Sequence, residues 1–465
     1  MFAKYFDGPV IEEEVRRLLH FGSCVRSLGR PMYTWRYRSG HNGYRLGDRV
    51  CLVIACALAG RPLLPNLKDL MLHFESKWDD PALLHLIHSP QLQSVYLSAS
   101  REFSKIDDIT LFVQRHANAP NMRVLTIDCL SRLPVVQTST SFQNLAQLTL
   151  STKPSRPIPT SVIHQWSTLK NLKWISLETG GFKSTSDRPT TKPCFGSLEI
   201  LRLDCPLDAA ATFLSTATFP VLSQFSFNLM LPKSPNSQVY PWTRMLEALR
   251  SGTSSHFQEL YIKLWDDSTP ECTLRNTRFT ASYPGVPFAD LEPILLQFKF
   301  VTFATHLPLL QPLALEDVLK IRDAWPEIET LVLEMLHTVE PQLDLTVLKL
   351  FSDQSCESLR DLYLVVDAAD IPRPKKIRST HRLESLGLYL KNWENSLENQ
   401  GYLASFIDSL FPHLADMDFQ TPHAEKLEDV AFIIETIRIG RRRERRFHNP
   451  DDYFSTDDDD EILSD

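Results

Sequence analysis

The clearest feature of the chain is a short pattern of hydrophobic positions that returns many times. Three apolar residues are spaced apolar-x-x-apolar-x-apolar, as in Leu67–Leu72, Met122–Ile127 and Leu198–Leu203. The copies begin at Leu67, Leu92, Met122, Leu145, Leu172, Leu198, Leu222, Phe257, Phe298, Ile328, Leu359, Leu383 and Leu414. Alternate side chains of a strand share a face, so each copy predicts a short strand with one apolar face.

The segments between the copies carry helical spacing. Ile106, Ile109 and Val113 lie on one helical face, and Val318, Ile321 and Trp325 repeat the pattern before the copy at Ile328. A proline often comes directly before the strand, where it ends the helix. A parallel strand needs a crossover of a dozen or more residues, commonly a helix. The chain therefore predicts repeated units of helix, turn and strand.

The period of these units predicts the architecture. Most steps between copies are 23 to 31 residues, close to the period of leucine-rich repeats. A single strand cannot bury its apolar face alone, so neighbouring units must stack. We expect an α/β fold, a right-handed leucine-rich-repeat solenoid shaped as a curved horseshoe. Its parallel sheet would line the concave face, and its helices would cover the convex face.

The ends of the chain have a different composition from the repeats. We expect an N-terminal helical cap at 1–60, the solenoid at 61–420, a capping helix at 421–446 and a disordered acidic tail at 447–465. Within the cap, Val50–Ala59 is expected to form a buried helix. The copy at Phe298–Phe303 fits the repeat least well. Arg441–Arg446 suits either a nuclear import signal or a solvated helix end, where cations complement the helix dipole.

Charge and cysteine content narrow the classes of function. A formal net charge of −8 argues against nucleic acid as a partner. The eight cysteines are scattered without a C-x-x-C pair, which favours reduced thiols in an intracellular protein of the cytoplasm or nucleus. No apolar run is long enough to span a membrane. His85 and His88 could offer two metal ligands, but no third is near in sequence, so we expect no metal, cofactor or catalytic residues.

Several segments of the sequence resemble the basidiomycete-type fungal F-box proteins with leucine-rich repeats. Leu83–Leu92 is similar to the helix before that family's second repeat, and Thr110–Leu125 to the next helix and strand. Ile321–Leu333, with its Trp-Pro pair, is similar to a later unit, and the resemblance extends over 10–420. The F-box itself is not found, because Met1–Leu28 resembles the stretch that normally follows it.

The resemblance implies a non-enzymatic protein-recognition module, the substrate receptor of a Skp-cullin-F-box ubiquitin ligase. An unknown target protein would bind it, and a Skp-type adaptor would join if an F-box exists upstream. The alternative is a stand-alone leucine-rich-repeat scaffold, or a truncated F-box gene product without a ligase role.

Outward positions on the concave face are the expected binding surface, because solenoids of this kind use it for recognition. Tyr and Arg are common interface anchors, although aromatic and charged residues also suit a sheet surface. The candidate residues at or beside outward strand positions are Tyr96, Lys173, Arg202, Tyr261, Lys263, Arg360, Tyr363 and Tyr389.

Overall fold

A computed structural model describes most of the chain. The described residues are 11–29, 53–54, 56–74, 81–100, 103, 105–117, 119–131, 133–152, 155–183, 192–231, 242–264, 285–306, 310–333, 340–353, 356–373, 381–420 and 428–448. The chain divides into two units, Met1–Asn276 and Thr277–Asp465, called here the N-terminal and C-terminal units.

Parallel strands run side by side through the N-terminal unit in chain order. They are β1 (Ser27–Leu28), β2 (Asp69–Phe74), β3 (Ser94–Ala99), β4 (Val124–Ser131), β5 (Gln147–Thr152), β7 (Trp174–Glu178), β9 (Ile200–Cys205), β10 (Gln224–Leu229) and β11 (Glu259–Leu264). Each of these strands pairs in parallel with the next. The short strands β6 (Ile158–Pro159) and β8 (Phe182–Lys183) form a separate parallel pair.

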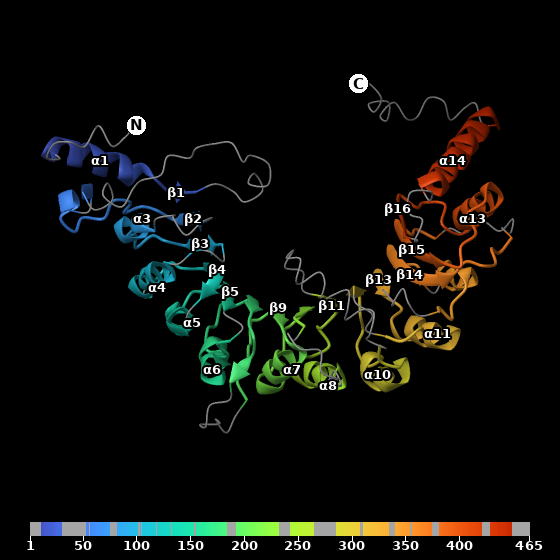
Figure 1. Cartoon of the computed structure of the whole chain (residues 1–465), viewed down its shortest axis with the longest axis horizontal. Coiled ribbons are helices and arrows are strands. Elements are labelled where there is room, and N and C mark those ends of the chain that lie inside the picture. Colours follow the sequence, from blue (N-terminus) through green and yellow to red (C-terminus); the bar gives the residue numbers. More distant parts are fainter. Residues whose placement is uncertain are drawn as a thin grey trace. The chain divides into compact units, whose positions relative to one another are not determined.

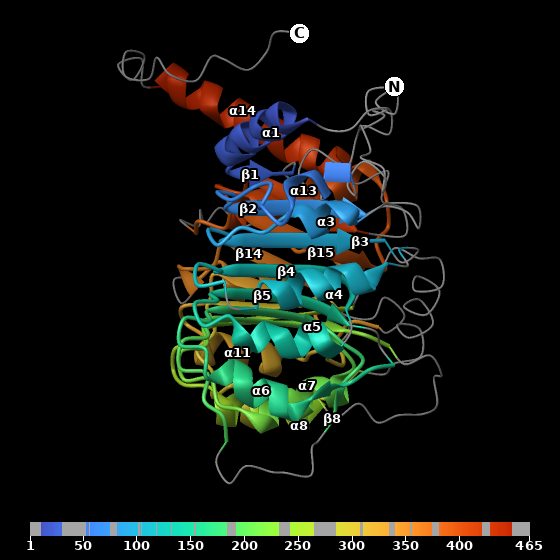
Figure 2. The ribbon, with the colours of Figure 1, turned by 90° about the vertical axis from the view of Figure 1, so that its left-hand side faces the viewer.

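Helices connect these strands and lie along one side of the sheet (Figure 1). They are α3 (Ala82–Leu86), α4 (Ile106–Arg115), α5 (Leu133–Thr138), α6 (Thr160–Ser167), α7 (Leu207–Thr216) and α8 (Trp242–Gly252), with the 3-10 turn η3 (Ser139–Ser141). A further helix, α1 (Glu12–Cys24), precedes the first strand. Figure 2 shows α4 and α5 in front of the parallel strands that they connect. This layering is the one that a parallel sheet with helical crossovers requires.

The C-terminal unit repeats the same arrangement. Its parallel strands are β12 (Thr302–His306), β13 (Thr330–Leu333), β14 (Asp361–Asp367), β15 (Ser385–Lys391) and β16 (Asp416–Gln420). Its helices are α10 (Phe288–Leu295), α11 (Leu315–Ala324), α12 (Leu348–Phe351), α13 (Leu397–Leu410) and α14 (Glu428–His448), with the 3-10 turn η4 (Leu345–Val347). Both units are therefore α/β solenoids in which each strand pairs with its neighbours in sequence.

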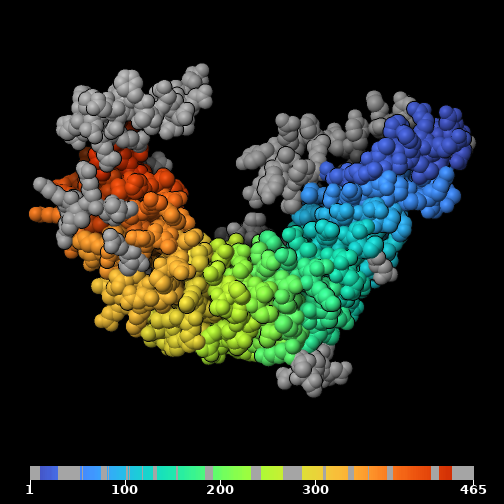
Figure 3. All heavy atoms as spheres, turned by 180° about the vertical axis from the view of Figure 1, so that it is seen from behind, coloured from blue at the N-terminus to red at the C-terminus, as the bar shows by residue number. Residues whose placement is uncertain are grey.

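The core of each unit lies between the sheet and its helices. The three apolar positions of a typical copy, Leu198, Leu201 and Leu203, are each 0% exposed. Burying one such side chain contributes about 1.5–3 kcal/mol. Aromatic contacts join the layers, since Phe227 of β10 meets Trp242 of α8 edge-on at 5.9 Å between ring centroids. Figure 3 shows successive repeats of the N-terminal unit as consecutive bands from blue to green.

Backbone hydrogen bonds tie successive repeats together at the start of each strand. The carbonyl of Lys173, directly before β7, accepts from the N–H groups of Glu199 and Ile200 at 2.9 and 3.0 Å. Polar side chains reinforce this edge. For example, Asn144 Nδ2 donates to the Pro120 carbonyl at 2.7 Å, and Ser197 Oγ donates to the Lys170 carbonyl at 2.6 Å. These bonds satisfy turn carbonyls that would otherwise be left without a donor.

One predicted copy is wrong in its frame. The pattern predicts Phe298–Phe303, but Phe303 pairs with Leu331, the middle apolar residue of the next copy. The repeat therefore occupies Phe300–Thr305. Thr305 fills the third inward position and is 2% exposed. Because the third inward position is polar, the apolar spacing indicated the wrong frame for this repeat.

The sheet begins earlier than the sequence predicts. β1 at Ser27–Leu28 pairs with Asp69–Leu70, within the segment expected to be a helical cap. The helix expected at Val50–Ala59 is also not wholly buried, because Val53 is 36% exposed while Leu58 is 2% exposed. The expected tail at 447–465 lies almost wholly outside the described residues. Among the described helices, none is both long and apolar enough to cross a membrane.

Candidate functional site

The outward face of the N-terminal sheet is lined by side chains in register. Here the outward face means the side opposite the buried leucines. Its middle row runs across the strands as Met71, Tyr96, Thr126, Thr149, Ser176, Arg202, Ser226 and Tyr261. The row combines aromatic, hydroxyl and cationic groups with the thioether of Met71.

A second row lies two residues further along each strand, and we call it the carboxyl row. Its members are His73, Ser98, Asp128, Ser151, Glu178, Asp204, Asn228 and Lys263. The pairing between β4 and β5 shifts register after Ile127, so Asp128 stands at an irregularity of the sheet. Unlike the middle row, this row concentrates carboxylates.

Polar contacts along single strands fix several of these side chains. Arg202 donates from Nε and Nη2 to the two oxygens of Asp204, both at 3.1 Å, and Tyr261 Oη donates to Glu259 at 3.2 Å. Burial raises the pKa of Tyr96, the nearby Asp128 carboxylate adds to that rise, and a hydrogen bond with Ser98 opposes it. The structure thus places Tyr96, Arg202 and Tyr261 in one row.

Lys263 lies in the carboxyl row, beside Asn228 and at an exposed position. It is therefore on the outward face, but not in the same row as Tyr261.

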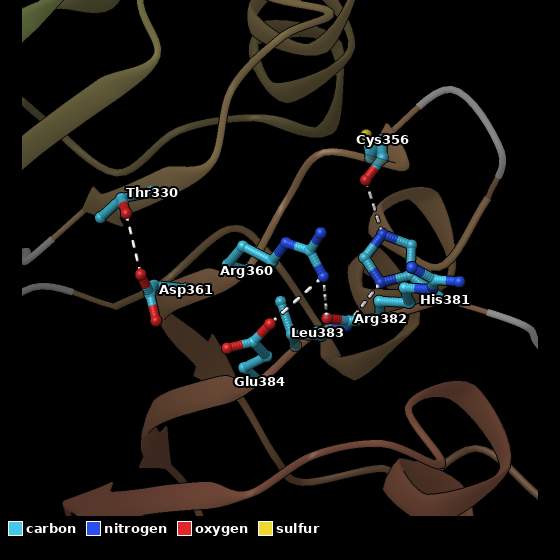
Figure 4. Close-up of polar contacts among 8 residues, drawn as sticks. All are labelled: Thr330, Cys356, Arg360, Asp361, His381, Arg382, Leu383 and Glu384. Carbon is cyan, nitrogen blue, oxygen red and sulfur yellow. Dashed lines mark hydrogen bonds and ion pairs between the residues drawn. The ribbon is translucent and has the colours of Figure 1, made fainter.

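Lys173 and Arg360 occupy a different place from the other candidates. Each lies directly before a strand, at the N-terminal end of that strand. Each forms an ion pair with the residue at the equivalent position of the next repeat. Lys173 Nζ is 2.7 Å from Glu199 Oε1, and Arg360 Nη1 is 3.2 Å from Glu384 Oε1 (Figure 4). These pairs are exposed, so each contributes at most about 1 kcal/mol. Both lie beside the outward strand positions, before the first residue of the strand rather than within the rows.

Tyr363 and Tyr389 lie on the outward face of the C-terminal sheet. Tyr363 pairs with Gly387, and Tyr389 pairs with Val365 on one side and Gln420 on the other. A Cβ placed on Gly387 would come within 2.0 Å of the Tyr363 ring. The missing side chain of Gly387 therefore lets the Tyr363 ring lie across the neighbouring strand.

A buried histidine organises the turn before β15 (Figure 4). His381 Nδ1 accepts from the Leu383 N–H at 3.1 Å, so the proton sits on Nε2, which donates to the Cys356 carbonyl at 2.6 Å. Burial lowers the pKa of His381, while its backbone bond opposes that shift. In the same region, Thr330 Oγ1 donates to Asp361 at 2.9 Å. The bonds of His381 tie the turn before β15 to the segment before β14, and the Thr330–Asp361 bond joins β13 to β14.

Several residues of this face were not among those that the apolar pattern singled out. Trp174, the first residue of β7, is 38% exposed. Asp128, Glu178 and Asp204 are the carboxylates of the carboxyl row. A usable signal was present for Trp174, since it directly precedes the second apolar residue of its copy. The carboxylates follow directly after the third apolar residue. Only the structure shows that they share a row.

The histidines considered as metal ligands and the first arginine of the basic run make contacts within the fold. His85 Nε2 lies 3.0 Å from Asp108, and His88 stacks obliquely near His116 with 5.6 Å between ring centroids. Within the described ranges, no group of three or more His, Cys, Asp or Glu side chains could hold a metal ion. Arg441 of the basic run forms an ion pair with the buried Asp408.

Comparisons with known proteins give no family assignment. No family model and no curated protein sequence matches the chain. Among solved structures, the chain is similar to an internalin from Listeria monocytogenes, with 13% identity, 79% coverage of each chain and a TM-score of 0.32. It is also similar to a protein from Bacteroides fragilis, with 10% identity, coverage of 73% of this chain and 70% of that one, and a TM-score of 0.30.

Proposed function

We propose that this chain is a non-enzymatic recognition module that binds a protein partner on its outward strand faces. The observation that supports this most is the registered middle row, with Tyr96, Arg202 and Tyr261 on one surface. Tyr and Arg supply large, partly polar contact areas and are enriched at interface centres. A parallel sheet also holds these side chains on a rigid support, which lowers the entropy cost of binding.

The test is affinity capture with a matched pair of variants. Replacing Tyr96, Arg202 and Tyr261 together by Ala should remove a specific partner that the wild-type chain retains. The control replaces exposed residues of the helices, Leu111, Arg244 and Glu247, also by Ala. Retention of the same partner by the triple face variant would contradict the proposal, provided that both variants show the wild-type circular dichroism spectrum.

A more specific role follows from the family resemblance. In this role the solenoid is a right-handed, curved horseshoe, and its concave face presents a substrate to a Skp-cullin-F-box ubiquitin ligase. The segments Leu83–Leu92 and Ile321–Leu333, which resemble that family, support this role. Co-purification with a Skp-type adaptor tests it, using a reading frame that includes the upstream genomic residues. Failure of that longer chain to retain the adaptor would remove the ligase role and favour a stand-alone scaffold.

A further inference from the structure

The stretch 129–177 of the N-terminal unit contains no acidic residue. The whole chain has 57 Asp and Glu residues, whereas this stretch holds several Lys and Arg and neither acid. It includes β5 and β7, and Arg123 precedes β4 just before it. The carboxylates that bound it, Asp128 and Glu178, belong to the carboxyl row, away from the amino ends of the strands. Positive charge therefore gathers at those amino ends.

The residues directly before the strands form a row of their own, called here the rim row. Backbone hydrogen bonds set its register, because each member donates its N–H to the carbonyl of the preceding member at 2.7–2.9 Å. From β2 to β9 its members are Lys68, Gln93, Arg123, Ala146, Lys173 and Glu199. Cations thus stand before alternate strands, with neutral residues between them.

Carboxylates compensate this charge only at the two ends of the row. At one end Lys173 is paired with Glu199, and at the other Asp69 directly follows the lysine before β2. Arg123 is exposed and makes no ion pair or side-chain hydrogen bond with any residue that the structure describes. Lys170, exposed in the turn before β7, is likewise unpaired within the described ranges. The uncompensated positive charge therefore lies before β4 and β7.

An apolar surface lies next to these cations. The first residues of β4, β5, β7 and β9 are in register as Val124, Gln147, Trp174 and Ile200. Val124 and Ile200 are half-buried, and Trp174 is exposed. Of the exposed large hydrophobic residues within the described ranges, Trp174 alone belongs to a strand. Tryptophan is enriched among the residues that dominate binding at interfaces.

We propose that the rim row before β4–β7 binds an acidic segment of the protein partner, with carboxylates facing Arg123 and Lys170 and an apolar side chain against Trp174. This inference rests on the proposed function and names the chemistry of the partner. A guanidinium group donates two parallel N–H bonds to a carboxylate, and an ammonium group adds a point charge. The middle row lies two residues further along each strand, so one partner can contact both rows.

The spacing of the cations favours an acidic peptide over a nucleic acid. Neighbouring strands are about 4.8 Å apart, so the cations before alternate strands recur about every 10 Å. An extended or polyproline-type segment advances about 3.1–3.3 Å per residue, so acidic residues at every third position match this interval. A nucleic acid strand carries a phosphate about every 3.4 Å, and most of its charges would meet no cation.

The experiment measures the binding of a fluorescein-labelled peptide, a repeat of Glu-Leu-Ser units, to the full chain by fluorescence anisotropy. The wild-type chain should bind it, and the rim variant, with Arg123→Gln and Lys170→Gln, should bind roughly fivefold more weakly through the loss of two charge-assisted contacts. The control with Arg16→Gln and Arg244→Gln removes the same charge from exposed positions of α1 and α8 and should bind like wild type. Equal loss in both variants, or no binding to the wild-type chain, overturns the inference.

The apolar contact has a test of its own. Trp174→Ala should weaken binding of the Glu-Leu-Ser peptide but leave a Glu-Ser-Ser peptide of the same length unaffected, because only the first peptide offers an apolar side chain. An equal effect on both peptides would overturn the pairing of acidic and apolar contacts.

A charge swap keeps the test decisive if the rim variant is unstable. The chain with Arg123→Glu should lose the Glu-Leu-Ser peptide and gain an Arg-Leu-Ser peptide, and no exchange of preference overturns the inference. Tighter binding of a single-stranded RNA of the same length, lost in the rim variant, would assign the rim row to nucleic acid and also overturn it. A protein partner captured through the middle row but indifferent to the rim variant would overturn this inference alone and leave the proposed function standing.

Discussion

At the scale of single residues, Gly387 shows how one small side chain shapes a binding face. Its missing Cβ makes room for the Tyr363 ring, which lies within 2.0 Å of where that atom would be. The apolar pattern marks Tyr363 as an outward residue but indicates no role for Gly387. The contact joins adjacent strands, so no local pattern in the sequence could reveal it.

We expect Gly387→Ala to destabilise the C-terminal unit by about 1–3 kcal/mol, because the new methyl group must push the Tyr363 ring aside. Gly401 on α13 is the matched control, since a Cβ there has nothing within 4 Å. Gly401→Ala should instead stabilise by about 0.4–1 kcal/mol. Denaturant unfolding measures both, and equal effects of the two substitutions would contradict the packing assigned to Tyr363.

His381 predicts a pH dependence with a definite sign. Burial lowers the pKa of His381 below its ordinary value of 6.5, so the unfolded chain takes up a proton at higher pH than the folded chain. The stability that the neutral imidazole contributes is full above pH 6.5 and is lost as pH falls through the folded-state pKa. His116, whose pKa burial also lowers, acts in the same direction.

The variant His381→Gln separates these two effects. At pH 7.5 it should lose about 1–3 kcal/mol through the broken bonds to Cys356 and Leu383. Between pH 7.5 and 5.5 its unfolding free energy should fall less than that of wild type, with His116 accounting for a residual slope. An unchanged slope in the variant would show that His381 does not titrate as its burial implies.

At the scale of elements, the apolar spacing predicted most strands, but it failed where buried positions are polar. Copies with three apolar residues, such as Leu198–Leu203, are in the predicted frame, whereas Thr305 displaced the frame of β12 by two residues. β1 was missed because two residues are too few to show a period. The rows of the outward face follow from strand register, which a repeat pattern alone predicts only in part.

The docking of α14 depends on one buried carboxylate. Asp408 on α13 is 1% exposed and faces two cations of α14, with Arg438 Nε at 3.6 Å from Oδ1 and Arg441 Nη2 in contact with Oδ2. Arg438 also donates to the Phe411 carbonyl at 3.4 Å. Arg441, the first residue of the Arg441–Arg446 run, therefore helps to hold this helix against α13.

We expect Asp408→Asn to destabilise the docking of α14 by about 1–3 kcal/mol, because it removes the buried carboxylate that faces the partly exposed Arg438 and Arg441. Hydrogen–deuterium exchange should speed up selectively in α14. The comparison variant is Asp323→Asn, which removes an exposed partner of Arg322 and should change exchange little. Unchanged protection of α14 in Asp408→Asn would contradict the assigned role.

At the scale of the whole molecule, the sequence predicted the class of architecture. The repeat period implied stacked parallel strands, and each unit has them. Two of the expected contact residues, Lys173 and Arg360, lie at the N-terminal ends of strands, where each forms an ion pair with the next repeat. Acidic residues spread over 128–204 could not be joined into one row without knowing which strands are neighbours and in what register.

The most direct test of the account is site-specific photo-crosslinking in cells. A benzophenone amino acid is placed on the outward faces, at Trp174, Tyr261 or Tyr389, and on exposed helix positions, at Leu111 or Tyr402. The account predicts that the face positions capture a common protein partner and that the helix positions do not. Capture of that partner from Leu111 or Tyr402 alone, with none from the strand positions, would contradict it.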